Sequence, residues 1–148
     1  MIEEIKEKAL KEDEITIIDV GTGAGFPGIP LKIAFPNLKI VLLDSLNKRI
    51  KFLNHIIENL ELNNIKAIHG RAEDFGKDNT YREKYDLCVS RAVANLSSLS
   101  ELCIPFVNID GCFISYKSDK SDEEIDNAKN AISILGCSII NIEFFHFH

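Results

Sequence analysis

Glycine recurs at every second position from Gly21 to Gly25, directly after an apolar, β-branched run that carries Asp19 near its end. This order of residues predicts a strand, a tight loop and the start of a helix. Glycines in such a loop let the backbone turn sharply and approach a ligand, because they carry no Cβ atom, and the helix that follows offers free N–H groups. The stretch therefore predicts a binding site for a nucleotide-like ligand.

The neighbours of the glycines bear on which ligand this is. Residues 23–28 formally match the dinucleotide pattern G-x-G-x-x-G, a weak signal that also suits an NAD-dependent oxidoreductase. The Asp19 carboxylate would repel a pyrophosphate but attract the cationic methionine portion of S-adenosylmethionine. Pro27 and Pro30 also remove two N–H donors that a pyrophosphate would need. We therefore expect S-adenosylmethionine. The residues expected around its methionine portion are Asp19, Gly21, Gly23 and Phe26.

A second acidic residue, Asp44, ends the next apolar run, Leu38 to Leu43. An acid at this place commonly accepts hydrogen bonds from the hydroxyls of a ribose, in NAD proteins and in S-adenosylmethionine proteins alike. The alternative is that Asp44 caps the helix that follows. We expect it to bind the ribose of an adenosine.

Three blocks of the chain resemble a known family. They are residues 19–31, residues 42–49 (Leu-Leu-Asp-Ser-Leu-Asn-Lys-Arg) and residues 89–92 (Val-Ser-Arg-Ala). In this order and spacing they look like the signature blocks of the bacterial small-subunit ribosomal RNA guanine-N7 methyltransferases, also called the glucose-inhibited division protein B family. The resemblance runs from about Ile15 to about Cys137. It implies a Rossmann-like class I methyltransferase fold, S-adenosylmethionine as cofactor, and methylation of one guanine N7 in the 16S rRNA of the small ribosomal subunit.

The resemblance also assigns residues to roles. Ala72 and Glu73, in the turn after a third strand, match cofactor contacts of the family and would lie at the adenine; an acidic helix start is the alternative for this turn. Arg91 matches a cofactor-contacting arginine, and its guanidinium could also donate to guanine O6 or to a phosphate near the transfer point. A structural ion pair with Glu73 or Asp19 is the alternative for Arg91.

The stretch after the fourth strand, where enzymes of this fold present residues to their target, lacks two known motifs. It holds neither an Asn-Pro-Pro-Tyr-like box, which methylation of exocyclic amines needs, nor a Pro-Cys nucleophile for attack on a pyrimidine. Guanine N7 explains both absences, because it carries an unprotonated lone pair at neutral pH and needs no general base. Catalysis then reduces to alignment and desolvation, with Arg91 as the candidate catalytic residue.

Alternating apolar runs and amphipathic stretches predict one doubly wound, mostly parallel α/β domain over residues 1–148. The expected strand order is 3-2-1-4-5 with an additional edge strand. The expected strands are residues 15–20, 38–43, 65–69, 85–90, 111–117 and 138–147, and the expected helices are residues 28–34, 47–62, 96–106 and 121–135. Residues 1–13 are expected to be a leading helix. Relative to the family, this leading region looks shortened and the final edge strand looks absent.

Composition leaves the substrate open. The 148 residues carry a net charge of −6, which is unfavourable for binding RNA phosphates. A small-molecule methyltransferase and a folded but inactive fragment of the rRNA enzyme therefore remain alternatives. The sequence contains no apolar run long enough to cross a membrane, so we expect a cytoplasmic protein.

The cysteines and histidines do not predict a metal site. Cys88, Cys103, Cys112 and Cys137 form no C-x-x-C pair. Buried, reduced thiols are the expectation for them. His146 and His148 lack a third ligand at suitable spacing.

Overall fold

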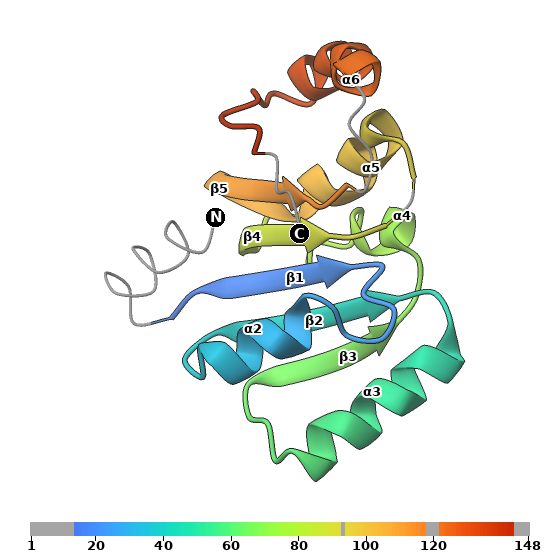
Figure 1. The fold of residues 1–148 in the computed structure, drawn as a ribbon, viewed down its shortest axis with the longest axis vertical. Coiled ribbons are helices and arrows are strands. Elements are labelled where there is room, and N and C mark those ends of the chain that lie inside the picture. Colours follow the sequence, from blue (N-terminus) through green and yellow to red (C-terminus); the bar gives the residue numbers. More distant parts are fainter. Residues whose placement is uncertain (1–13, 93, 118–121, 144–148) are drawn as a thin grey trace, which may run out of the picture.

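A five-stranded parallel sheet forms the centre of the computed structural model, which describes residues 14–92, 94–117 and 122–143. Its strands lie side by side in the order β3-β2-β1-β4-β5 (Figure 1), as predicted. The strands are β1 (Thr16–Val20), β2 (Lys39–Asp44), β3 (Ile65–His69), β4 (Tyr85–Ser90) and β5 (Val107–Ser115). The helices are α2 (Gly28–Ala34), α3 (Asn47–Asn59), α4 (Ala72–Phe75), α5 (Leu96–Cys103), the 3₁₀ turn η1 (Ile104–Phe106) and α6 (Asp122–Ile134).

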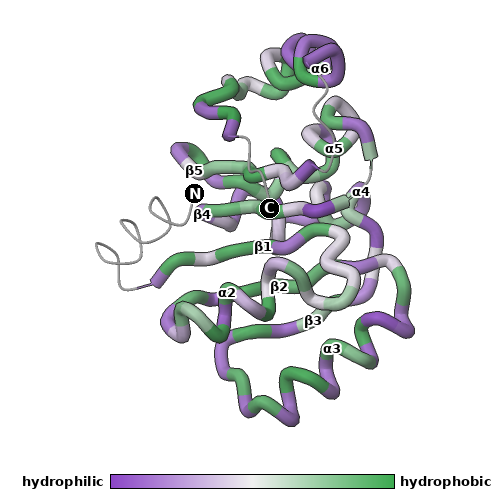
Figure 2. Tube along the Cα trace, viewed as in Figure 1, coloured by the Kyte–Doolittle hydropathy of each residue, from purple (hydrophilic) through white to green (hydrophobic). Residues whose placement is uncertain are grey.

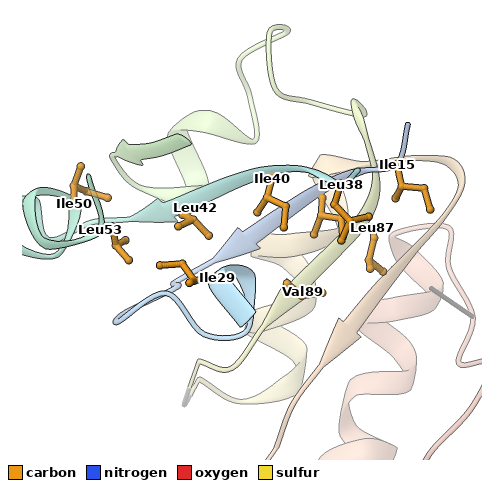
Figure 3. Packing of buried hydrophobic residues seen from close by; sticks show 10 residues of the cluster. Ile15, Ile29, Leu38, Ile40, Leu42, Ile50, Leu53, Leu87 and Val89 are labelled. Carbon is orange, nitrogen blue, oxygen red and sulfur yellow. The ribbon is translucent and has the colours of Figure 1, made fainter. Parts of the chain in front are cut away.

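Helices cover both faces of the sheet, which confirms the doubly wound arrangement. One apolar cluster joins β1 and β2 to Ile29 of α2 and to Ile50 and Leu53 of α3 (Figure 3). A second cluster on the other face joins β1 and β4 to Leu99 and Cys103 of α5. Because both faces are buried, the strands are apolar almost throughout, as the green tube of β1 and β2 shows in Figure 2. Phe106, Leu42 and Leu53 are among the fully buried side chains.

The register of the sheet places the functional ends of the strands together. Asp19 of β1 pairs with Leu42 of β2 and with Val89 of β4. Strand β1 lies between β2 and β4, so the chain leaves it on one side through α2 and returns on the other through β4. Ligands of such sheets bind at this reversal of strand order, beyond the carboxyl ends of the strands.

Most predicted boundaries lie within two residues of the structure, and three differ by more. Helix α3 ends at Asn59 rather than at residue 62, and Glu61 directly beyond it has a positive φ of 50°. The fourth predicted helix divides into α5 and η1, with Pro105 at the start of the 3₁₀ turn, because proline cannot donate the backbone hydrogen bond that an α-helix requires. Strand β5 begins at Val107, before the predicted residue 111, and includes an irregularity in its pairing with β4.

The predicted sixth strand is wrong for its described part. Gly136, with φ of +79°, ends the α6 region as expected, but residues 138–143 form no strand. Ile140 is 78% exposed there. Apolar alternation indicates a strand only where a neighbouring strand is available for hydrogen bonding, and no sheet pairing reaches residues 138–143. Residues 144–147 of the prediction, and the leading helix expected at residues 1–13, lie outside the described residues.

The cysteines differ in their burial. Cys88 and Cys103 are buried, as expected, whereas Cys112 is half-buried. Cys137 is exposed, so its prediction as a buried thiol is wrong; it lies just beyond Gly136, where α6 has ended and no strand covers the chain. No group of three metal-ligating side chains occurs among residues 14–92, 94–117 and 122–143. Within the same ranges, no helix combines the length and the apolar character that a membrane crossing requires.

Candidate functional site

A pocket of about 520 Å³ lies beyond the carboxyl ends of β1, β2 and β4. Its walls come from the glycine loop after β1, the start of α3, the turn before α4 and the segment after β4. All the predicted site residues except Asp19 line it. They are Gly21, Gly23, Phe26, Asp44, Ala72, Glu73 and Arg91. The structure therefore brings together residues that are as much as 70 positions apart in the sequence.

The glycine loop adopts conformations that favour glycine. Gly21, Gly23 and Gly25 have φ values of +68°, +62° and +94°. A Cβ at Gly25 would lie 2.6 Å from Ile29 Cδ1, so this position also requires a close approach to the helix. Gly23, in contrast, faces open space, because nothing lies within 4 Å of a Cβ built there. The loop therefore presents bare backbone to the pocket.

Asp19 lies directly beneath the loop and is fully buried. Its Oδ2 atom accepts hydrogen bonds from Thr22 Oγ1 at 2.7 Å and from Gly28 N at 2.9 Å. Its Oδ1 atom has no hydrogen-bond partner among the described residues. An unpaired buried carboxylate oxygen is costly, and here it leaves one acceptor of Asp19 unused beneath the glycine loop.

Burial also controls the charge of Asp19. Desolvation raises the pKa of Asp19 to about 6, because burial disfavours the charged form. The hydrogen bonds from Thr22 and Gly28 and the positive charge of Arg91 act in the opposite direction, but they only partly offset the desolvation. Asp19 is therefore ionised at pH 7.5 and becomes protonated as the pH falls through about 6.

The close packing around Asp19 depends on Gly28 at the start of α2. A Cβ at this position would lie 2.3 Å from Leu42 Cδ2 and 3.0 Å from Asp19 Oδ2. Glycine thus allows α2 to approach β1 and β2 closely enough for the Gly28 N–H to donate to Asp19.

Asp44 occupies the corresponding place at the end of β2 and is only 2% exposed. Its Oδ2 accepts the N–H of Gly23 at 2.9 Å, and its Oδ1 accepts the N–H of Leu46 at 2.9 Å. The Arg49 guanidinium forms an ion pair with it, with Nη1 3.2 Å from Oδ2. Leu46, not Asp44, is the N-cap residue of α3. The structure therefore does not support the alternative in which Asp44 caps helix α3.

The third wall of the pocket comes from the turn between β3 and α4. The N–H of Gly70 donates to Asp44 O at 3.1 Å, which holds this turn beside the end of β2. A Cβ at Gly70 would lie 2.1 Å from Phe75 Cε2, so α4 packs tightly onto the turn. Ala72 and Glu73 then lie in the first turn of α4 and face the pocket.

Arg91 follows β4 on the opposite side of the pocket. The preceding Ser90 fixes this segment, because its hydroxyl donates to Val20 O at 2.8 Å and accepts the N–H of Ala92 at 3.3 Å. The Arg91 guanidinium lies over the Phe26 ring, with its carbon 5.6 Å from the ring centre. This is a cation–π contact across the pocket.

The alternative prediction for Arg91, a structural ion pair, finds no support in the geometry. Across residues 14–92, 94–117 and 122–143, the ion pairs within 4.0 Å do not include Arg91. Its charge acts on Asp19 only at longer range, through the lowered pKa described above. Within the described residues, its guanidinium is thus not committed to an ion pair.

The sequence prediction missed two basic residues of the pocket. Arg49 and Arg71 line it together with Arg91, so three arginines and two acids, Asp44 and Glu73, surround the opening. Arg49 belongs to a basic cluster at the start of α3 that is also typical of a solvated helix face. Two signals in the sequence could have identified these residues. Arg49 follows Asp44 by five residues, and Arg71 directly precedes Ala72.

Comparison with known proteins identifies the family of the chain. The family model described as "GidB: rRNA small subunit methyltransferase G" matches residues 3–148. The ribosomal RNA small subunit methyltransferase G of Acetivibrio thermocellus is 56% identical over 137 residues, which are 93% of this chain and 56% of the relative. The protein of the same name from Clostridium kluyveri is 56% identical over 131 residues, 88% of this chain and 55% of the relative. The chain thus spans about half the length of the curated relatives it matches.

The fold itself is also found among solved structures. The crystal structure of a putative S-adenosyl-L-methionine-dependent methyltransferase from Methanococcus maripaludis superimposes with a TM-score of 0.61. It is 19% identical and covers 88% of this chain and 60% of that protein. The architecture is therefore the Rossmann-like fold of class I methyltransferases. With the family match over nearly the whole sequence, the chain belongs to the GidB family of small-subunit rRNA methyltransferases.

Proposed function

We propose that this chain binds S-adenosylmethionine and transfers its methyl group to N7 of a guanine in the 16S rRNA of the small ribosomal subunit. One observation carries the cofactor part of the proposal. Two buried acids, Asp19 and Asp44, lie at the ends of adjacent strands on either side of the glycine loop, and one Asp19 oxygen lacks a partner. The family membership supports the choice of reaction.

Asp19 is the residue that would hold the amino acid end of the cofactor. An ammonium group is a donor that Asp19 Oδ1 could accept, and the negative charge present above about pH 6 strengthens this hydrogen bond. Gly21 and Gly23 line the pocket without side chains and leave room for the cofactor, and Phe26 offers an apolar ring in the same lining. A pyrophosphate, in contrast, would be repelled by a buried carboxylate.

Asp44 would accept the ribose hydroxyls. Ala72 and Glu73, in the first turn of α4, are the residues that would border the adenine. These assignments give the cofactor one direction in the pocket, from Asp19 through the glycine loop to α4. Its reactive sulfur would then lie near Arg91 and the opening.

When bound, S-adenosylmethionine supplies a methyl group carried on a positively charged sulfur. Guanine N7 holds an unprotonated lone pair, so no side chain has to remove a proton, and the protein has to align and desolvate the reacting atoms. Arg91 is the candidate catalytic residue, because its guanidinium is free of ion pairs within the described chain and faces the pocket. It would orient the guanine by donating to O6 or to a neighbouring phosphate.

Charge distribution supports an RNA substrate despite the net charge of −6. Arg49, Arg71 and Arg91 gather around one opening, and phosphate contacts from such groups supply much of the affinity for nucleic acid. The acidic surface elsewhere favours the second candidate, methylation of a small molecule. We place the protein in the cytoplasm with its substrate, the small subunit.

Two measurements test the proposal. Calorimetry with S-adenosylmethionine and S-adenosylhomocysteine should give saturable binding with one site per chain; binding of NADH in preference to S-adenosylhomocysteine would refute the cofactor assignment. Radioactive methyl transfer to undermethylated 30S subunits should label one guanine in 16S rRNA.

Binding of the cofactor without transfer to 30S subunits would contradict the RNA assignment for this chain and favour a small-molecule substrate or an inactive fragment. An Arg91→Ala variant that binds cofactor but transfers no methyl group would support the role of Arg91.

A further inference from the structure

The carboxylate of Asp44 has no free acceptor position left. Its Oδ1 accepts the N–H of Leu46 at 2.9 Å and lies 3.5 Å from Arg49 Nη1. Its Oδ2 accepts the N–H of Gly23 at 2.9 Å and lies 3.2 Å from the same Nη1. A carboxylate offers about four acceptor positions, two on each oxygen, so these contacts occupy all of them.

The four contacts are not equally fixed. The donors of Gly23 and Leu46 are backbone N–H groups, and the loop conformation holds both of them in place. The Arg49 contact is longer, and its side chain is 51% exposed. The two backbone donors cannot leave without unfolding the loop, whereas the half-exposed Arg49 guanidinium can turn from the buried Asp44 toward water. Arg49 is therefore the donor that a ligand can displace.

We propose that Arg49 is a displaceable latch on the ribose site: its ion pair with Asp44 and the binding of a ribose diol to Asp44 exclude each other. This inference rests on the proposed function, since it takes Asp44 as the acceptor of the ribose hydroxyls. The diol needs two acceptor positions on the carboxylate, and only the two used by Arg49 can be released. The cofactor then binds a pocket whose Arg49 side chain has swung away from Asp44.

The displaced arginine stays at the pocket. Arg49 lies on the first turn of α3 and lines the same opening as Arg71 and Arg91. Released from Asp44, its positive charge is available to an anionic substrate at this opening. Cofactor binding thereby increases the unpaired positive charge that the protein presents to RNA phosphates.

The test compares S-adenosylhomocysteine affinities of the wild type and Arg49→Gln by calorimetry. Loss of the competing ion pair should tighten binding about two- to fivefold, the range expected when one partner of an ion pair remains half-exposed to solvent. Lys48→Gln is the matched control, because it removes the same charge from the neighbouring position of α3, outside the pocket lining. Its affinity should equal that of the wild type. The direction of the effect is diagnostic, since removal of a residue that contacts the cofactor would weaken binding instead.

Salt gives a second readout. Raising the ionic strength screens this ion pair only in part, because Asp44 is buried, so S-adenosylhomocysteine should bind the wild type more tightly at 0.5 M than at 0.05 M salt by a smaller factor. Arg49→Gln should show no such change. Equal or weaker binding by Arg49→Gln, with measurable binding by the wild type, would overturn the latch and leave the proposed function standing. Absence of binding in all three proteins would instead refute the proposed function, and the latch with it.

Discussion

Replacement of Asp19 by asparagine separates the stability of this fold from its ligand binding. The amide is nearly the same shape as the carboxylic acid, so its oxygen can accept the hydrogen bonds of Thr22 Oγ1 and Gly28 N. The substitution removes the buried negative charge, whose Oδ1 has no partner in the described chain. We expect Asp19→Asn to be more stable than the wild type at neutral pH and to bind S-adenosylmethionine poorly.

The magnitude follows from the raised pKa. Asp19 has a pKa of about 6 in the folded protein against an ordinary value of 3.8. The folded state thus holds the proton more tightly, and the free energy of unfolding falls as the pH rises from the ordinary value through about 6. At pH 7.5 the full loss is about 3 kcal/mol at 1.36 kcal/mol per pKa unit, and at pH 5 it is about half of that. Asparagine has no such loss at either pH.

Urea and thermal unfolding of the ligand-free proteins measure this difference. At pH 7.5 the variant should gain up to about 3 kcal/mol, or roughly 5–10 °C in Tm. The gain should shrink at pH 5 and disappear near pH 3. Asp78→Asn is the control of opposite sign, because hydrogen bonds from Thr80 lower the pKa of Asp78 and make its charge favourable. An Asp19→Asn protein less stable than the wild type at pH 7.5, or one with the same gain at every pH, would refute the reasoning.

Three further substitutions test other parts of the structure. Asp44→Ala should weaken S-adenosylhomocysteine binding at least tenfold in calorimetry, because it removes the acceptor proposed for the ribose; unchanged affinity would remove that assignment. Gly28→Ala should lower the free energy of unfolding by about 1–3 kcal/mol in urea, because its Cβ would lie 2.3 Å from Leu42 Cδ2 in a packed core; a neutral result would mean that α2 can move away from the sheet. Ser115→Ala should leave stability unchanged or raise it by up to about 1 kcal/mol, because the Ser115 hydroxyl is buried with no partner among the described residues; a clear loss of stability would indicate a hydrogen bond to water.

The order of the strands and the position of the pocket could be predicted from the sequence. Apolar runs alternate with amphipathic stretches, which predicts a doubly wound parallel sheet, and the methyltransferase fold implied by the family resemblance has the order 3-2-1-4-5 that the structure shows. The glycine loop and Asp44 come at the ends of neighbouring strands, which must meet at one edge of a parallel sheet. Seven of the eight predicted site residues line the pocket for this reason, while the contacts proposed for them with a ligand stay predictions.

Other features of the fold and the site depend on three-dimensional contacts, which the pattern of apolar and polar residues in the sequence does not reveal. The ion pair between Arg49 and Asp44 depends on the conformation of the long Arg49 side chain, and the position of Arg49 in the helix does not determine that conformation. Residues 138–143 have the composition of a strand, yet a strand also needs a partner, and partners are set by the whole sheet. The early start of β5 at Val107 reflects its irregular pairing with β4, which a residue pattern alone does not predict.

The hydrogen bond from Ser90 to Val20 joins the two sides of the pocket across 70 residues of sequence. A growing chain therefore makes the glycine loop and both acids long before it makes the strand that closes the pocket beside them. Closing such a long loop is slow, because the chain must give up conformational freedom before the contact stabilises it. Arg91 and Ala92 follow this junction and line the pocket, so the pocket has its full lining only in a molecule whose late junction has formed.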